Sequence, residues 1–391
     1  MGDVLALRLL MLTQDFPPVV GGIQTYTGCL ARLWSEWCDD FAVMAPAHPE
    51  DAAWDRQHDF DIFRENTSSD LFRIRIDRAL NRLLKERHFD AVFTGHWYVA
   101  RAAIAARKRG WDGQVFSAAH AQELIKNIFP RGLKWAYAKH RRHVCENLDG
   151  LYPVSRFTGE LSKTLGVDPR KITVVPNGTD VERFSGVTEE HCSDFRQRYQ
   201  IATDSPLIGT VCRLVSRKGI DTVLKALPGV IQRFPNLTYI VVGHGPDKER
   251  LSALVTMLNL TQHVRFLGKI PFQDLVPAYA TLDCFVMPAR QEGASVEGFG
   301  LVFTEASACG VPVIGGRSGG VPDAIVDQKS GFLVTPDSVP ELTDRLVQLL
   351  SSRELRSTLG DYGKQHVREH GTWRVAARRI FDDMERKCAL S

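Results

Sequence analysis

The sequence of 391 residues lacks several features that are typical of other classes of protein. It has no apolar run long enough to cross a membrane, and its first residues lack the pattern of a secretory signal, so we expect a cytoplasmic protein without transmembrane helices. The 49 basic and 46 acidic residues nearly cancel, which gives no reason to expect nucleic acid as a partner. We find no tandem repeat and no low-complexity segment.

The eight cysteines are scattered along the chain, and no two of them have the spacing of metal ligands. Several lie within apolar runs. This usage excludes a disulfide-stapled secreted domain and predicts free, partly buried thiols in a reducing compartment.

The length of the chain favours two domains of nearly equal size over a single core. Strand-length apolar runs alternate with helical patterns in both halves, which predicts parallel sheets flanked by helices and therefore two doubly wound α/β domains. The predicted strands include residues 7–13, 41–44, 91–94, 115–118, 207–212, 239–242, 284–287 and 311–314. We divide the chain into domains at 1–185 and 186–370 and a C-terminal segment at 371–391, with a polar linker stretch around 180–205. The segment 373–384 has a helical pattern.

The most informative segment is EGFGLVFTEA, which begins at Glu297 and holds a second carboxylate at Glu305. Gly298 and Gly300 allow the backbone to approach a ligand closely, and they precede a helix expected to begin near Leu301. Glu305 then lies about one turn into that helix, so the two carboxylates can contact different ends of an extended ligand. The alternative is that one glutamate caps the helix and the other is solvated.

A glycine pair, Gly21 and Gly22, separates the predicted strand 7–13 from a helical pattern at 23–33. A helix N-terminus behind such a turn offers free N–H groups to phosphate. An ordinary tight turn is the alternative.

Two cations, Arg213 and Lys218, follow the predicted strand 207–212. They are suited to a diphosphate, since arginine grips two oxygens and lysine supplies a point charge. His120 follows the strand 115–118, and by itself it is more typical of a core histidine.

Together these segments resemble the retaining glycosyltransferases of family 4, which have the GT-B fold. Further segments of the same family occur in the same order at 149–161, 171–184, 239–251 and 264–289. The resemblance therefore covers nearly the whole chain.

This resemblance implies two Rossmann-like domains facing a central cleft, with an acceptor site in the first, a nucleotide-sugar site in the second and a C-terminal helix that crosses back to the first. The catalytic residues that it implies are His120 and Glu297, which face the transferred sugar, and Arg213 and Lys218, which bind the donor phosphates. The implied donor-binding residues are Gly21, Gly22, Gly243, Gly245, Ile270, Gly298, Phe299, Gly300, Leu301 and Glu305.

The reaction implied is transfer of a hexose with retention of configuration, without a cofactor or a metal. The departing phosphate oxygen takes the acceptor proton, so no protein base is needed. The triplet Asp59-Phe60-Asp61 has the form of a metal-binding motif of the other large glycosyltransferase fold, but we expect no metal there, because no other acidic cluster supplies further ligands.

The loop QEGASVEGFG resembles that of mannosyltransferases acting on phosphatidylinositol lipids, so GDP-mannose is the preferred donor, ahead of UDP-glucose and UDP-N-acetylglucosamine. The acceptor is a lipid-linked or saccharide hydroxyl in glycolipid or surface polysaccharide synthesis. The alternatives are a sugar-nucleotide epimerase or hydrolase of the same fold and a catalytically silent nucleotide-sugar-binding protein. A nicotinamide-dependent dehydrogenase is disfavoured, since Gly21-Gly22 is not a dinucleotide-binding pattern.

The segment 126–143 interleaves basic and aromatic residues. An ordinary solvated helix face is the simpler interpretation, and docking on an anionic membrane surface is the alternative. The residues concerned are Lys126, Phe129, Arg131, Lys134, Trp135, Tyr137, Lys139, Arg141 and Arg142.

Overall fold

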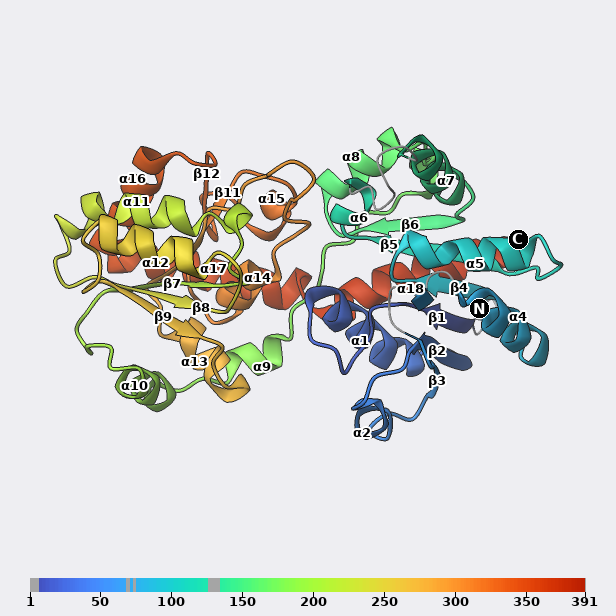
Figure 1. The fold of residues 1–391 in the computed structure, drawn as a ribbon. Coiled ribbons are helices and arrows are strands. Elements are labelled where there is room, and N and C mark those ends of the chain that lie inside the picture. Colours follow the sequence, from blue (N-terminus) through green and yellow to red (C-terminus); the bar gives the residue numbers. More distant parts are fainter. Residues whose placement is uncertain (1–6, 68–70, 73–74, 126–133, 391) are drawn as a thin grey trace. The chain divides into compact units, whose positions relative to one another are not determined.

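The computed structural model describes residues 7–67, 71–72, 75–125 and 134–390, and it divides into two compact units (Figure 1). The first unit comprises Met1–Gly178 together with Trp373–Ser391, and the second comprises Thr179–Thr372.

The first unit is built on a parallel sheet of six described strands in the order β3-β2-β1-β4-β5-β6. The strands are β1 (Arg8–Leu12), β2 (Asp40–Pro46), β3 (Asp61–Glu65), β4 (Ala91–Thr94), β5 (Gln114–Ala119) and β6 (Gly150–Pro153). The helices described around it are α1 (Gly22–Ser35), α2 (Asp51–Asp55), α4 (Asp77–Glu86), α5 (Trp97–Arg107), α6 (Gln122–Ile125), α7 (Lys134–Glu146), α8 (Arg156–Thr164) and α18 (Trp373–Ala389).

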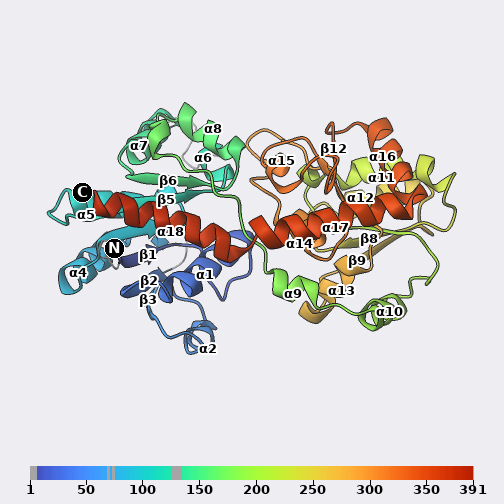
Figure 2. The same ribbon diagram turned by 180° about the vertical axis from the view of Figure 1, so that it is seen from behind.

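Both faces of this sheet are buried, as parallel sheets require. On one face, residues of α4, α5 and α7 pack against the strands in a single apolar cluster. On the other face, Trp34 of α1 packs edge-on against Phe93 of β4 and donates a hydrogen bond to the carbonyl of Ala377 in α18 (3.1 Å). Tyr152 of β6 donates to Asp383 of α18 (3.1 Å). The last helix of the chain therefore belongs to the first unit, where it runs beside α1 (Figure 2).

The second unit is built on another parallel sheet, with the described order β12-β11-β10-β7-β8-β9. Its strands are β7 (Leu207–Val211), β8 (Thr238–Val242), β9 (Val264–Gly268), β10 (Cys284–Met287), β11 (Val313–Gly316) and β12 (Gly331–Val334). The α-helices described are α9 (Val181–Ser185), α10 (Glu189–Arg198), α11 (Ile220–Ile231), α12 (Lys248–Met257), α13 (Leu275–Ala280), α14 (Leu301–Ala308), α15 (Val321–Ala324), α16 (Val339–Ser351) and α17 (Arg353–His370). Alternate strand residues pack into two apolar clusters, one on each face.

In each sheet the strand order reverses direction at one point, between β1 and β4 in the first unit and between β7 and β10 in the second. Loops that leave the carboxyl ends of two such neighbouring strands diverge and create a crevice, the usual place for a ligand in this architecture. The fold thus directs attention to the loops after β1, β4, β7 and β10.

The two doubly wound units and the terminal helix confirm the predicted fold. The strands at 91–94 and 284–287 have the predicted bounds. The strand predicted at 311–314 begins later, at Val313, because the N–H of Val311 closes α14 by donating to Ala306 and Pro312 has no N–H to give.

The segment predicted as a linker around 180–205 is not a bare linker. Phe184, Phe195 and Ile201 are buried in the core of the second unit, so the helices that carry two of them, α9 and α10, pack on that unit. Accordingly, the division falls between Gly178 and Thr179 instead of between 185 and 186.

All eight cysteines are free thiols in the structure. None of the described helices combines the length and apolar composition needed to cross a membrane.

Candidate active site

The loop after β7 carries two cations into the crevice of the second unit. It forms a short turn at Ser216–Lys218 and ends at Gly219, which has a left-handed backbone (φ 73°). A Cβ at this position would lie 2.2 Å from the carbonyl oxygen of Pro288, so only glycine fits. The tight turn holds Arg217 and Lys218 side by side, and Lys218 is buried.

Both cations bind Glu297, which belongs to the loop after β10. Its Oε2 accepts a hydrogen bond from Lys218 Nζ at 2.5 Å and one from Arg217 Nη1 at 2.6 Å. Burial raises the pKa of Glu297, but the charges of Lys218 and Arg217 outweigh this effect and lower the pKa to about 2. Glu297 is therefore a permanent anion that holds two cations together.

A glycine loop fixes the backbone at Glu297. The N–H of Gly320 donates to the carbonyl oxygen of Glu297 (2.8 Å). At the preceding Gly319 (φ 55°), a Cβ would lie 2.4 Å from that same oxygen. The close contact between these two loops fixes the position of the Glu297 backbone, from which the carboxylate side chain extends.

The turn from Gly298 to Leu301 leads directly into α14. Gly300 has a left-handed backbone (φ 97°) and Phe299 is buried, which anchors the turn on the core. The helix begins at Leu301, as the sequence predicts, and Glu305 lies in its second turn.

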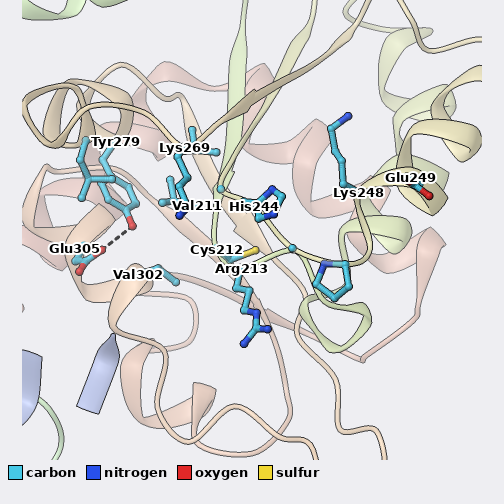
Figure 3. A pocket seen from close by; sticks show the side chains of 15 residues that line it. Val211, Cys212, Arg213, His244, Lys248, Glu249, Lys269, Tyr279, Val302 and Glu305 are labelled. Atoms are coloured by element: carbon cyan, nitrogen blue, oxygen red, sulfur yellow. Dashed lines mark hydrogen bonds between the residues drawn. The ribbon is translucent and has the colours of Figure 1, made fainter. Parts of the chain in front are cut away.

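A cavity of about 1000 Å³ opens in the second unit beside the ends of β7 and β8 (Figure 3). Four of the predicted site residues line it, namely Arg213, Gly243, Gly245 and Glu305. The remaining lining residues are Val211, Cys212, Val242, His244, Pro246, Lys248, Glu249, Lys269, Leu275, Tyr279 and Val302. The predicted residues Lys218, Ile270, Glu297 and those from Gly298 to Leu301 are not part of this lining.

The two cavity glycines are required by close packing between loops. A Cβ at Gly243 (φ 127°) would lie 1.9 Å from the carbonyl oxygen of Cys212, and one at Gly245 would lie 2.1 Å from that of Leu214. In this part of the cavity wall, the backbone after β8 lies directly against the backbone after β7.

Glu305 accepts a hydrogen bond from Tyr279, whose hydroxyl lies 2.6 Å from Oε2. Burial raises the pKa of Glu305, and the phenol together with the charge of Arg183 acts in the opposite direction. Figure 3 shows this pair at one side of the cavity and Arg213 at another.

At the carboxyl ends of the central strands of the first unit, His120 lies in a cluster of ionisable side chains. The ring of His120 packs edge-on against Tyr26 and His96, and its backbone N–H donates to Glu123 Oε1 (2.6 Å). His96 lies 3.1 Å from Asp15 Oδ2. These residues follow the carboxyl ends of β1, β4 and β5 or lie in the helices behind them.

Burial shifts the pKa of each of three groups in this cluster. It lowers the pKa of His96 to about 4 and, with the nearby His96, that of His120 to about 3. It raises the pKa of Glu123 to about 7. Both histidines are therefore neutral at physiological pH.

The glycine pair before α1 is less constrained than the sequence suggests. Gly21 is extended (φ 175°), a conformation open to any residue, and a Cβ at Gly22 would meet no atom within 4 Å. The turn in this loop lies instead at Pro17 and Pro18.

The predicted set omits several residues of these two sites, among them Arg217, Tyr279, Asp15 and His96. Arg217 is adjacent to Lys218 in the sequence, and Asp15 and His96 follow predicted strands, so position at a strand end was an available signal. Nothing local in the sequence indicates that Tyr279 meets Glu305.

Asp61 of the acidic triplet forms an ion pair with Arg87 (2.6 Å), which also binds Asp40. The side chains that the structure describes form no group of three or more His, Cys, Asp or Glu suited to a metal ion.

The basic segment 126–143 is only partly described, since Lys126, Phe129 and Arg131 and the side chain of Lys134 lie outside the described residues. Tyr137 is buried and lies under the guanidinium of Arg141, so these two do not form an outward basic-aromatic pair as the segment suggests. Trp135 is 70% exposed.

Solved structures of glycosyltransferases have the same fold. That of Anabaena Alr3699/HepE in complex with UDP superimposes with a TM-score of 0.81 over 97% of this chain and 100% of that chain, at 19% identity. Lipopolysaccharide glycosyltransferase WaaG has a TM-score of 0.70 at 18% identity, over 96% of this chain and 99% of that one. The two doubly wound units thus have the GT-B fold.

Sequence comparison identifies the family. The model for glycosyl transferases group 1 matches residues 193–366, and that for Glycosyltransferase Family 4 matches residues 20–183. The chain is 31% identical to the GDP-mannose-dependent monoacylated alpha-(1-6)-phosphatidylinositol monomannoside mannosyltransferase of Corynebacterium glutamicum, over 97% of this chain and 98% of that protein. It is also 31% identical to a GDP-mannose-dependent alpha-(1-6)-phosphatidylinositol monomannoside mannosyltransferase of Mycobacterium tuberculosis, over 96% and 97%. The chain belongs to the family 4 glycosyltransferases, and it is an enzyme of the glycosyl-transferring class.

Proposed function

We propose that this enzyme transfers a mannosyl residue from GDP-mannose to a lipid-linked hydroxyl, with retention of anomeric configuration. The observation that best supports hexosyl transfer is the binding of Lys218 and Arg217 to Glu297 where the loops after β7 and β10 meet. The choice of mannose and of a lipid acceptor is supported by the names of relatives that match this chain over nearly its full length.

The chemistry asked of the site is stabilisation of a leaving diphosphate. The bond between C1 of the sugar and the β-phosphate oxygen breaks, and the acceptor oxygen bonds to C1 on the same face while its proton passes to the departing phosphate. Lys218, Arg217 and Arg213 are the cations available to the developing charge, which a preorganised site stabilises more strongly than water does. No metal ion is required by this proposal.

We propose further that Glu297 holds the transferred sugar. When the diphosphate draws Lys218 and Arg217 toward itself, Oε2 of Glu297 is released and can accept hydrogen bonds from sugar hydroxyls. Since its pKa is about 2, the carboxylate stays ionised throughout. The roles of His120 beside the sugar and of Gly21 and Gly22 near the diphosphate remain predictions.

The test is release of GDP from GDP-mannose in the presence of EDTA, with and without phosphatidylinositol mannoside acceptor, followed by NMR of the product. We expect release that depends on the acceptor and survives EDTA, and an α-linked product. Release of GDP with free mannose and no lipid product would instead indicate a hydrolase, and loss of activity in EDTA would contradict the metal-free mechanism.

We also propose that the first unit docks on anionic membranes. Trp135, at the start of α7, is 70% exposed, and Lys139 and Arg142 on the same helix are exposed as well. Sedimentation with phosphatidylinositol-containing liposomes at low salt should fall in Trp135→Glu. The matched control is Met257→Glu, because Met257 is equally exposed (71%) but lies in the second unit. Equal loss in both variants would contradict the proposal.

A further inference from the structure

The cavity of the second unit contains a buried hydroxyl that binds one of its two carboxylates. Tyr279 has no exposed surface, and its hydroxyl donates to Glu305 Oε2 at 2.6 Å. Figure 3 shows the phenol approaching Glu305 from the cavity wall, with both residues on the lining.

The ring of Tyr279 cannot turn away from this contact. Phe184 packs edge-on against it with ring centroids 5.8 Å apart, and Phe285 of β10 packs against it at 5.7 Å. Aromatic neighbours on two sides fix the ring, so the hydroxyl is held at one point in space.

A fixed donor decides which way the carboxylate faces. With Oε2 bound to Tyr279, Oε1 of Glu305 is left for a ligand in the cavity. The hydrogen bond also favours the ionised form of a carboxylate whose burial raises its pKa. A buried carboxylate without such a donor tends to take up a proton and to lose its strength as an acceptor.

We propose that Tyr279 is a positioning residue for recognition of the donor ribose: it orients Glu305 so that one carboxylate oxygen accepts from the ribose hydroxyls. This inference rests on the proposed function and on the role that the resemblance to family 4 implies for Glu305, which is to bind the ribose of the donor nucleotide. Tyr279 itself does not touch the reacting atoms, and its effect is on discrimination between ribose and deoxyribose nucleotides.

The test is calorimetric titration of the full chain with GDP and with 2′,3′-dideoxy-GDP, for the wild type and for Tyr279→Phe. The wild type should bind GDP at least about tenfold more tightly than the dideoxy analogue, since the hydroxyls hydrogen-bond to a charged acceptor. Tyr279→Phe should weaken GDP binding by about tenfold and leave binding of the analogue within about twofold. In turnover, KM for GDP-mannose should rise by a similar factor, with kcat within about threefold.

Tyr239→Phe is the matched control. Tyr239 is equally buried in β8 of the same unit, and its hydroxyl lies 2.7 Å from Thr210 Oγ1, outside the cavity lining. This variant also loses one buried hydrogen bond of a phenol, but it should retain the wild-type preference for ribose.

Three results would overturn the proposal. Equal weakening of both nucleotides in Tyr279→Phe would mean that the tyrosine only supports the fold, and unchanged binding of both would mean that its hydroxyl has no role. A wild type that binds GDP and the dideoxy analogue equally would remove the ribose-binding role of Glu305 itself. That third result contradicts the proposed donor site as well, whereas the first two leave it intact.

Discussion

Replacing Glu297 by glutamine removes the anion that holds the buried Lys218 and the half-buried Arg217 together, and the expected loss of stability can be worked out from the pKa of Glu297. That pKa is about 2 instead of the ordinary 4.5, and the difference corresponds to about 3 kcal/mol of unfolding free energy at neutral pH. Glutamine keeps a neutral acceptor for Lys218 and Arg217 but not the charge. We therefore expect Glu297→Gln to unfold with about 2–3 kcal/mol less free energy than the wild type at pH 7.

The stability difference between the wild type and Glu297→Gln should depend on pH. The folded pKa of Glu297 is lowered, so its contribution is fully present above pH 4.5 and is lost as the pH falls toward 2. The difference between wild type and variant should accordingly shrink to about 2 kcal/mol or less at pH 3.5. Other carboxylates titrate in both proteins and cancel in the comparison.

The assay is urea unfolding followed by far-UV circular dichroism. All seven tryptophans of the chain lie in the first unit, so tryptophan fluorescence does not report directly on the unit that contains Glu297. Glu354→Gln is the matched control, because Glu354 is an exposed glutamate of the same unit and should change stability by less than about 0.5 kcal/mol.

A loss below about 1 kcal/mol at pH 7, or one that does not shrink on acidification, would refute the reasoning. The same variant separates stability from chemistry. Because the substitution releases Lys218 and Arg217, it should bind GDP at least as tightly as the wild type while its turnover falls.

Three further predictions concern other residues. Lys218→Ala should lower turnover by about a hundredfold or more in the GDP-release assay, the scale of losing one preorganised donor to a developing anion, and near-normal turnover would exclude that role. Burial lowers the pKa of His96 and His120 to about 4 and 3, so their contribution to stability is present above pH 6.5 and is lost as the pH falls toward these values. The stability of His96→Gln, measured by tryptophan fluorescence, should therefore fall less on acidification than that of the wild type. An equal fall would contradict the assignment. Gly243→Ala should lower the free energy of unfolding by more than about 3 kcal/mol, because its Cβ would meet the Cys212 carbonyl. Gly268 also has a positive φ (67°) but faces open space, so Gly268→Ala should lower it by only about 1–2 kcal/mol. Equal melting temperatures of the two variants would refute the packing argument.

The extent to which the sequence predicts this fold depends on how each strand is buried. The strands β4 and β10 lie between other strands and are buried on both faces, so they are short continuous apolar runs with clear ends. The edge strand β3 has one neighbour and partly exposed residues, and its sequence DIFRE looks like a polar loop. An edge strand needs less apolar surface, and a periodicity argument is weakest there.

The candidate active site also has parts that the sequence predicts and parts that it does not. The turn at Gly300 and the start of α14 are set by neighbours in the sequence, and they follow from it. The binding of Arg217 and Lys218 to Glu297 joins residues 80 and 79 positions apart, and only the meeting of two loops at a reversal of strand order brings them together. The resemblance to a family supplied the importance of Lys218 and Glu297, but not the fact that they bind each other.

The two glutamates eight positions apart owe their different properties to their partners, although both are carboxylates beside the start of α14. Lys218 and Arg217 lower the pKa of Glu297, while at Glu305 burial outweighs the neutral donor Tyr279 and the pKa is raised. Cations that are paired with a carboxylate can exchange it for a more highly charged anion, which suits a position where a diphosphate arrives and leaves. A carboxylate held by a neutral hydroxyl keeps its orientation when charge moves nearby, which suits a position that recognises hydroxyls. Two environments thus give one acidic pair two separate tasks, and substitutions of the partners should separate these tasks as cleanly as substitutions of the glutamates themselves.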